Sequence, residues 1–378
     1  MIRVGVLSPV FCTGGVERWL IALAKNLPEQ VCVVGMGLSP GAPTDRDSVR
    51  ELSHFVPIFG TKRFSDIGRD SPEFVYRFDT YAEVCDRVCD CDILLVWGDT
   101  TVPDWYTGIV VAVAHGAVDW SRRQMEKYDG PRTRYVAVSR EALKAIPLNR
   151  RKDAVVIHNG VELDRLCPRA TQRELKLQHG VRPKTTVVGY IGRFSEEKDP
   201  TAAARAVKEL NAHRKNTVAM YCGTGMDGGE TERKVTELLG KRVIWKEPKD
   251  VADALAMADV LVCASPVEGF GLVRVEAMTR GVPLVCTNTG VIPEIVERYG
   301  KVCSLIRDPQ NTAELAWAVL DAISDFKMTI TAASACHENF TARRMADRWT
   351  SYFEGVMDEE HRPETVDDRP PLSVRGTE

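Results

Sequence analysis

The sequence has no marked excess of either charge and contains no long hydrophobic run. Aromatic residues make up 7% of the 378 positions, and 50 Lys and Arg stand against 53 Asp and Glu, which gives a net charge of −3. This balance argues against a general nucleic-acid coat, although it allows a local basic patch. No apolar stretch approaches the ~20 residues that a membrane-spanning helix needs.

The remaining composition is that of a globular protein. Apolar residues at 44% and charged residues at 27% exclude a mainly disordered, collagenous or disulfide-held chain. Among the 11 scattered cysteines only Cys85, Cys89 and Cys91 cluster, and no second pair at zinc spacing accompanies them. The apolar run at residues 2–7 is too short for a signal peptide. We therefore expect a cytoplasmic protein with reduced thiols, with peripheral membrane contact as an alternative.

Strand and helix patterns alternate along the chain in two successive runs. The first begins with a continuous apolar strand over residues 2–7, a Gly14–Gly15 loop and a helical pattern that ends at Pro28. The second begins with a strand at residues 187–191, after a polar stretch. This alternation predicts an α/β fold with two doubly wound, Rossmann-like domains. Ligands of such sheets bind outside the carboxyl ends of the strands, so we expect a cleft between the domains.

The domain boundaries follow from where the alternation stops and restarts. We expect a first domain at residues 1–165 and a second at residues 166–341. A last helix at residues 342–357 would cross back to the first domain. The tail at residues 359–378 is rich in Pro, Asp and Arg, has few apolar residues and is predicted to be disordered.

The strongest motif is a pair of glutamates, Glu268 and Glu276, separated by seven residues. Glu268 follows a buried strand directly, and Glu276 lies inside the next predicted helix. A solvated helix would explain Glu276 alone. It does not explain the glycines Gly269 and Gly271 between the strand and the helix, which point to a binding loop.

Three weaker motifs also lie at predicted strand ends. Gly192 to Lys198 combines a glycine with Arg193 and Lys198, which can grip a diphosphate; a charged surface loop is the alternative. Gly14 and Gly15 open a helix whose free amides attract anions; a plain tight turn is equally consistent. His115 ends a strand, and a structural histidine is its ordinary interpretation.

Together these segments resemble the GT-B glycosyltransferases of family 4, which are retaining, sugar-nucleotide-dependent enzymes. The resemblance runs to about residue 357 and keeps the family's order. It is carried by these segments: Gly14 to Arg18, Ala114 to Gly116, Ile157 to Glu162, Gly192 to Lys198, Gly223 to Gly225, Glu268 to Glu276 and Gly290 to Glu294. The glutamate motif is the most specific, and the N-terminal matches are looser.

The resemblance implies a role for each matching residue. Glu276 would hold the ribose hydroxyls, Glu268 the hydroxyls of the donor sugar, and Arg193 and Lys198 the diphosphate. His115 would lie beside the donor sugar, near the reacting carbon. The remaining implied donor contacts come from loop backbones and from the base pocket: Gly14, Gly15, Gly223, Trp245, Lys246, Glu247, Phe270, Gly271 and Leu272.

The implied activity is transfer of a hexose-type sugar from a UDP- or GDP-sugar to an acceptor hydroxyl with retention of configuration. The acceptor could be a glycan, a lipid-linked glycan or a small molecule. In this type the leaving phosphate itself takes the acceptor's proton, so no carboxylate nucleophile is expected. No cofactor or metal is expected either, since Asp45–Asp47 and Asp90–Asp92 lie in a polar loop and at the wrong end of a strand for metal ligands.

Two other classes of function compete with this interpretation. Gly223 to Gly228 matches the dinucleotide fingerprint, with Glu247 19 positions further on, which would fit an NAD-dependent oxidoreductase. That reading leaves the paired glutamates without a role. An inactive sugar-nucleotide-binding protein is the third reading, although every key position is filled.

The acceptor side is less determined. Residues 121–152 contain ten Lys and Arg and three Asp and Glu, a local net charge of +7 that fits a membrane surface, an anionic acceptor or a solvated basic face. Nucleic acid is an unlikely partner because the overall charge gives it no support. We expect Trp97 to Asp99 and Asp104 to Tyr106 near the cleft, where aromatic rings could bind an acceptor; core packing is the alternative.

Overall fold

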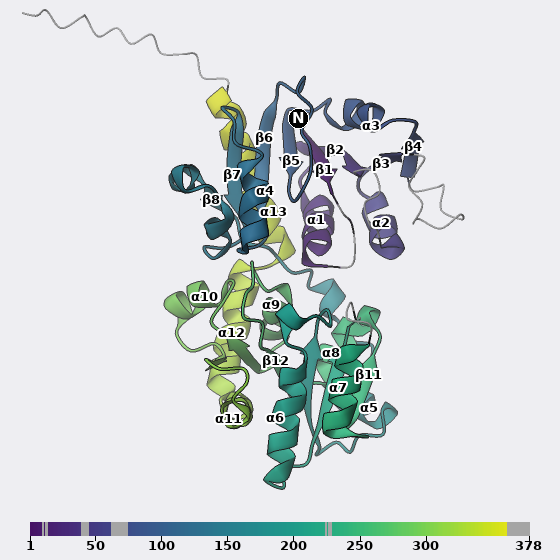
Figure 1. Cartoon of the computed structure of the whole chain (residues 1–378), viewed down its shortest axis with the longest axis vertical. Helices are drawn as coiled ribbons and strands as arrows, with labels where there is room; N and C mark the ends of the chain where they lie inside the picture. Colours follow the sequence, from purple (N-terminus) through teal and green to yellow (C-terminus); the bar gives the residue numbers. More distant parts are fainter. Residues whose placement is uncertain are drawn as a thin grey trace, which may run out of the picture.

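The computed structural model describes residues 1–9, 11, 14–38, 45–61, 75–223, 225 and 229–360. Two parallel β-sheets, each flanked by helices, are stacked along the long axis of the molecule (Figure 1). The predicted α/β fold with two Rossmann-like units is confirmed. Residues 361–378, which make up most of the tail predicted to be disordered, lie outside the described residues.

The first sheet has eight parallel strands in the order β4-β3-β2-β1-β5-β6-β7-β8. They are β1 (Ile2–Ser8), β2 (Val31–Leu38), β3 (Ile58–Thr61), β4 (Val75–Phe78), β5 (Ile93–Val96), β6 (Ile109–Ala114), β7 (Thr133–Ala137) and β8 (Val155–Val156). The accompanying helices are α1 (Gly15–Asn26), α2 (Arg46–Ser53), α3 (Tyr81–Val88) and α4 (Asp119–Glu126), with short 3₁₀ turns η1 (Ala142–Ala145) and η2 (Leu148–Asp153). The central strands β1, β5 and β6 are almost entirely buried, as their continuous apolar runs require.

The second sheet has six parallel strands in the order β11-β10-β9-β12-β13-β14. They are β9 (Thr186–Ile191), β10 (Thr217–Cys222), β11 (Val243–Lys246), β12 (Val260–Cys263), β13 (Leu284–Thr287) and β14 (Ser304–Ile306). Its helices are α5 (Gln172–Gln178), α6 (Thr201–Ala212), α7 (Glu230–Leu239), α8 (Val251–Met257), α9 (Leu272–Thr279), α10 (Ile292–Tyr299), α11 (Thr312–Ser324) and α12 (Phe326–Asn339), with 3₁₀ turns η3 (Asp164–Leu166), η4 (Glu196–Lys198) and η5 (Pro248–Asp250).

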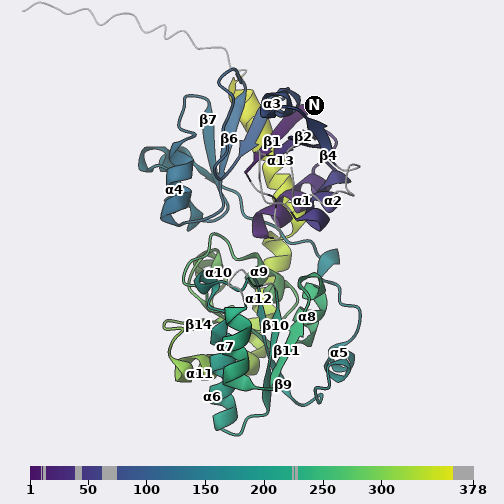
Figure 2. The same ribbon diagram turned by 45° about the vertical axis from the view of Figure 1, so that its right-hand side comes forward.

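The last helix, α13 (Ala342–Glu360), lies against α1 of the first unit, as both ribbon views show (Figures 1 and 2). Its Trp349 ring packs 5.7 Å from the ring of Trp19. The chain crosses between the units beside Gly160, where an added Cβ would lie 2.3 Å from the carbonyl oxygen of Thr341. Only glycine allows this close approach. The domain boundaries themselves stay a prediction.

Candidate functional site

The loops that follow β6 and β12 touch across the two units. A Cβ added to Gly269 would lie 1.8 Å from the carbonyl oxygen of His115, so the two backbones are in direct contact. The hydroxyl of Ser139 donates a hydrogen bond to the carbonyl of Gly269. The amino ends of α1 and α9 also meet, since a Cβ on Gly15 would lie 3.5 Å from Cδ1 of Leu272. The predicted strand-end residues of both units therefore converge on one region.

Lys198 and Glu268 form an ion pair inside this region. Nζ of Lys198 lies 2.9 Å from Oε1 of Glu268, and both side chains are largely buried. Burial acts to raise the pKa of Glu268, but the charges of Lys198 and Arg274, with hydrogen bonds from Lys198 and Ser265, outweigh it and hold that pKa below its usual range. Glu268 is therefore a carboxylate at neutral pH.

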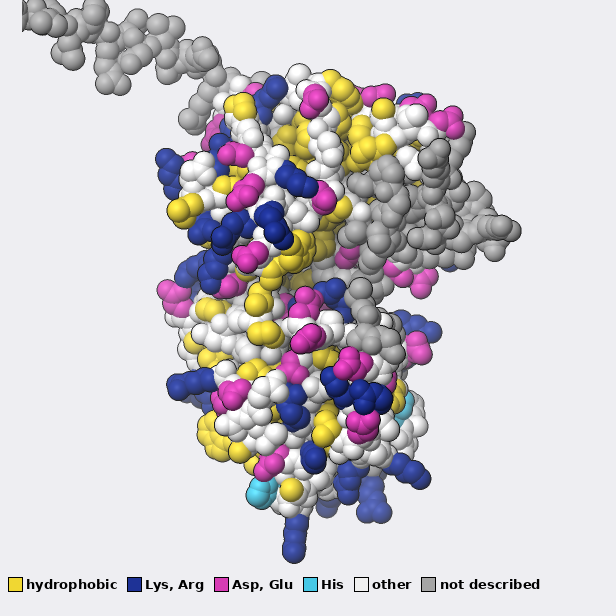
Figure 3. Space-filling view, in the orientation of Figure 1, with side chains coloured by type: hydrophobic (Ala, Val, Ile, Leu, Met, Phe, Trp, Pro, Cys, Tyr) yellow, Lys and Arg dark blue, Asp and Glu magenta, His cyan; other side chains and the backbone are white. Residues whose placement is uncertain are grey.

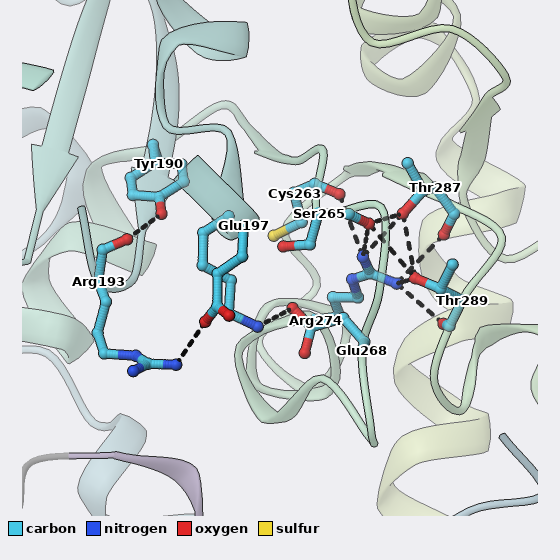
Figure 4. Close-up of polar contacts among 10 residues, drawn as sticks. Tyr190, Arg193, Glu197, Cys263, Ser265, Glu268, Arg274, Thr287 and Thr289 are labelled. Atoms are coloured by element: carbon cyan, nitrogen blue, oxygen red, sulfur yellow. Dashed lines mark hydrogen bonds and ion pairs between the residues drawn. The ribbon is translucent and has the colours of Figure 1, made fainter. Parts of the chain in front are cut away.

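Arg193 follows β9, and Figure 4 shows its contacts with Tyr190 and Glu197. Its guanidinium is half-exposed and forms an ion pair with Glu197 at 2.7 Å. Its carbonyl accepts a hydrogen bond of 2.6 Å from the hydroxyl of Tyr190. The preceding Gly192 has φ +151°, which lets the chain turn sharply after β9. The backbone of Arg193 is thus held by Tyr190, and its side chain by Glu197.

Arg274 is a buried cation that the sequence reasoning missed. It lies on α9 within the glutamate motif, and its guanidinium donates hydrogen bonds to the loops that end β12 and β13 (Figure 4). The signal that could have found it is a charge between Val273 and Val275, in a helix whose neighbours are apolar. Such a residue is almost never fully buried without a specific partner.

Glu276 has no side-chain hydrogen bond or ion pair among the residues that the structure describes, although it is only 8% exposed. Burial raises the pKa of Glu276; the charges of Arg165 and Arg18 act to lower it, and that of Glu162 to raise it further. A buried carboxylate without a partner is costly. It is therefore suited to accept hydrogen bonds from the hydroxyls of a ligand.

The amino end of α9 begins at a glycine in the left-handed region. Gly271 precedes the helix with φ +91°, a conformation that favours glycine. The first amides of a helix have no acceptor within it and attract anions. The side chain of Phe270 turns away from this end and packs near His158 and Phe340, so only its backbone is placed toward a ligand.

The predicted nucleobase segment lies at the ends of β10 and β11. The ring of Trp245 packs 5.0 Å from the ring of Tyr221. Lys246 points its Nζ at Nε2 of His179, 3.2 Å away, and the side chain of Glu247 is exposed. Gly223 lies so close to the preceding strand end that a Cβ there would meet the carbonyl oxygen of residue 192 at 1.9 Å. Thr224 and residues 226–228 of the dinucleotide fingerprint lie outside the described residues.

His115 lies between the aromatic core and the site. Its ring packs 4.6 Å from the ring of Trp19, and its Nε2 is shielded from solvent without a hydrogen-bond partner among the described residues. Burial lowers the pKa of His115 to about 3. The imidazole is therefore neutral at physiological pH and can donate or accept one hydrogen bond to a ligand.

The Asp-x-Asp segments have structural partners. Asp45 accepts the amide of Ser48 at 2.8 Å as the N-cap of α2. Asp90 and Asp92 bind the side chain and the amide of Arg3. In the part of the chain that the structure describes, no three His, Cys, Asp or Glu side chains gather as metal ligands would.

The aromatic segment at Asp104–Tyr106 lies at the wrong end of the sheet for an acceptor site. The Tyr106 hydroxyl donates hydrogen bonds of 3.3 and 3.4 Å to the carbonyls of Ile109 and Cys91, which lie at the starts of β6 and β5. The expectation that this segment lies near the cleft is therefore wrong. Trp97 does lie near the site, because its buried ring packs edge-on to His115 at 5.9 Å.

The basic segment at residues 121–152 carries fewer unpaired charges than its sequence implies. Arg140, Lys127 and Arg134 pair with carboxylates that come from outside the segment. Arg122 and Arg123 of α4 have no ion pair within the described ranges. Lys and Arg side chains gather on this flank of the upper unit (Figure 3).

Two parallel α/β units facing each other through their strand ends, with acids and cations at the contact, define the GT-B architecture. Residues 141–335 match the family described as glycosyl transferases group 1. The chain therefore belongs to this family. The predicted resemblance is confirmed at this level.

Similar proteins agree with this assignment. The chain is 31% identical to a D-inositol 3-phosphate glycosyltransferase of Corynebacterium jeikeium over 227 residues, which are 55% of this chain and 53% of the relative. It is 27% identical over 220 residues to an N-acetyl-alpha-D-glucosaminyl L-malate synthase of Bacillus anthracis, at 56% of each chain. The chain thus spans about half the length of the curated relatives it matches.

Solved structures share the whole fold. Anabaena HepE in complex with UDP-glucose superposes with a TM-score of 0.73 at 19% identity, covering 94% of this chain and 100% of that one. Sucrose-phosphate synthase from Thermosynechococcus elongatus superposes with a TM-score of 0.61 at 16% identity, covering 95% and 100%. At these identities the likeness concerns the fold.

Proposed function

We propose that the protein is a glycosyltransferase that moves a hexose-type sugar from a nucleotide diphosphate sugar to an acceptor hydroxyl, with retention and without a required metal. Two observations on one loop-and-helix segment carry the proposal: the Lys198–Glu268 ion pair, and the buried carboxylate of Glu276, which has no side-chain partner among the described residues. The solved neighbour HepE was crystallised with UDP-glucose, which favours a UDP-sugar as donor. GDP-sugars are the alternative donors.

Donor binding would exchange partners within the ion pairs. Lys198 and Arg193 would turn from Glu268 and Glu197 to the diphosphate, assisted by the amides at the amino ends of α9 and α1. The released carboxylate of Glu268 would accept hydrogen bonds from the sugar hydroxyls. Glu276 would receive the ribose hydroxyls, which supply the partners that it lacks.

The proposed reaction needs stabilisation of a departing diphosphate. The bond between the sugar carbon and the phosphate oxygen breaks, and negative charge develops on the phosphate. The acceptor oxygen bonds to the carbon on the same face, and its proton passes to the departing phosphate. Neutral His115, next to this point, would hold the sugar by a hydrogen bond rather than act as an acid.

The base would lie at the ends of β10 and β11, near Trp245, Lys246 and Glu247. Gly223 would allow the backbone to approach it closely. Gly14 and Gly15 would face the diphosphate from the first unit.

The acceptor is a glycan, lipid-linked glycan or small molecule, and the α4 flank is the place to seek it. Trp120 and Leu148 are 55% and 79% exposed, and Arg122 borders the same cavity of about 590 Å³ as Leu148. Exposed apolar side chains beside cations favour contact with an anionic membrane surface. Across the described ranges, no helix is both long and apolar enough to span a bilayer.

Turnover of a panel of UDP-, GDP- and ADP-sugars tests the proposal, with and without EDTA. We expect release of the nucleoside diphosphate from one donor, unaffected by EDTA. Binding of NADH in place of every nucleotide sugar would favour an oxidoreductase instead. Tight UDP binding without turnover of any donor would favour an inactive sugar-nucleotide-binding protein.

A further inference from the structure

The buried guanidinium of Arg274 ties together two loops of the donor site. Arg274 is 1% exposed. One of its terminal nitrogens donates to the carbonyl and the hydroxyl of Thr289 at 2.9 and 3.0 Å, and to the carbonyl of Thr287 at 3.2 Å. The other donates to the hydroxyl of Thr287 at 3.0 Å, and at 3.4 Å to the carbonyls of Cys263 and Ser265. The loops after β12 and β13 therefore share one anchor.

All of these acceptors are neutral, so the charge of Arg274 has no direct counter-ion. No carboxylate lies within ion-pair distance of it among the described residues, and its Nε is buried without a partner. Glu268 feels this charge, which helps to lower the pKa of its carboxyl group. A buried, uncompensated cation is costly unless an anion binds nearby.

The position of this cation points to such an anion. The aliphatic part of Arg274 folds back beneath the turn that starts α9, since a Cβ on Gly271 would lie 3.0 Å from Cδ of Arg274 and 3.5 Å from its Nε. The positive end of the helix dipole and the buried guanidinium thus lie together. Lys198, which pairs with Glu268, and Arg193 both lie in the segment that follows strand β9.

We infer that Arg274 is a positioning residue of the donor site, which holds the Ser265–Glu268 and Thr287–Thr289 loops in register and places a permanent positive charge beneath the diphosphate. The inference rests on the proposed function, because it requires a diphosphate ligand. Arg274 would act on the ligand through the position of these loops and through the electrostatic potential of its charge, since its guanidinium is covered by protein. A charge fixed before binding stabilises the departing phosphate without reorganisation.

The test compares UDP with uridine, which lacks the phosphates, by titration calorimetry. In Arg274→Met we expect the Kd of UDP to rise about tenfold or more, because the positive charge that attracts the diphosphate is lost. The Kd of uridine should change by less than about threefold, because uridine carries no phosphate for this charge to attract. An equal loss for both ligands, or no loss for either, would overturn the inference and leave a merely structural arginine.

The Arg274→Lys variant keeps the test decisive if the methionine variant fails to fold. Lysine keeps the charge but cannot supply the planar fork that reaches both loops. We expect its UDP affinity to stay near that of the wild type, while kcat falls about tenfold or more from misplaced loops. An unchanged kcat would overturn the inference alone. Absence of UDP binding by the wild-type protein would overturn the proposed function as well.

Discussion

Replacing Glu276 by glutamine should make the protein more stable and a worse nucleotide binder. Glu276 is 8% exposed and has no side-chain partner among the described residues. An unsatisfied buried polar group costs about 1–3 kcal/mol, and glutamine keeps the shape without the charge. We expect a gain of about 1 kcal/mol in the free energy of unfolding, since the amide still lacks partners. Such trade-offs are typical of binding residues.

The pH dependence of this gain has a fixed sign. Burial raises the pKa of Glu276, so the native state binds this proton more tightly than the unfolded chain does. The cost of the charge is present above the native pKa and is relieved as pH falls through it. The advantage of Glu276→Gln should therefore be largest at neutral pH and shrink in mildly acidic buffer.

Urea unfolding of the wild type and of Glu276→Gln, at neutral and at mildly acidic pH, measures the difference in their free energies of unfolding. Glu162→Gln is the matched control: Glu162 is 6% exposed, but one of its oxygens pairs with Lys25 at 3.1 Å, so loss of its charge should not stabilise the protein. Affinity for UDP should fall at least tenfold in Glu276→Gln, because hydrogen bonds to a charged group contribute about 1.5–3 kcal/mol. A less stable Glu276→Gln protein with unchanged UDP affinity would refute the reasoning.

Three further predictions test the contact between the units and the charges near the donor. Gly269→Ala places a Cβ against the carbonyl of His115 and should lower the free energy of unfolding by about 3 kcal/mol, or separate the units, which a larger radius of gyration would reveal. In the control Gly355→Ala in α13, the added Cβ meets open space and should raise the free energy of unfolding by up to about 1 kcal/mol. Equal effects of the two substitutions would contradict the contact. Burial lowers the pKa of His115 to about 3, so its contribution to stability is full above the unfolded pKa and is lost as pH falls below ~6.5, by up to about 1.4 kcal/mol per pH unit. The free energy of unfolding of His115→Asn should therefore fall less steeply with decreasing pH than that of the wild type, and identical slopes would argue against a buried neutral ring. Arg193→Ala should lower turnover at least tenfold, since charge-directed contacts of this kind contribute about 2.7–4 kcal/mol, while the exposed Lys208→Ala should not; normal turnover in the Arg193 variant would exclude its role in the mechanism.

The two sheets could be predicted from sequence because their central strands are continuous apolar runs between turns. The edge strands β3 and β4 carry no such pattern. They have four residues each, and the exposed Tyr76 on β4 breaks any continuous apolar pattern. Helix α12 also gives a weak sequence signal, since its buried face is built largely from small residues such as Ala332 and Ala335.

The site residues on strand ends could be predicted because parallel sheets gather their carboxyl ends at one edge. Contacts between segments that are distant in the sequence could not be predicted in this way. The bond from His158 to Glu294, with Nε2 and Oε2 2.9 Å apart, joins residues 136 positions apart. The route of the loop from β5 back to the start of β6, which removes Tyr106 from the cleft, is likewise invisible to a pattern in the chain.

A crystal structure with UDP tests the central claim most directly. The account predicts that the ribose hydroxyls lie within hydrogen-bond distance of the Glu276 carboxylate, with the diphosphate at the amino end of α9 and Lys198 turned away from Glu268. Ordered UDP bound elsewhere, with Glu276 still unpartnered and the Lys198–Glu268 pair intact, would contradict it.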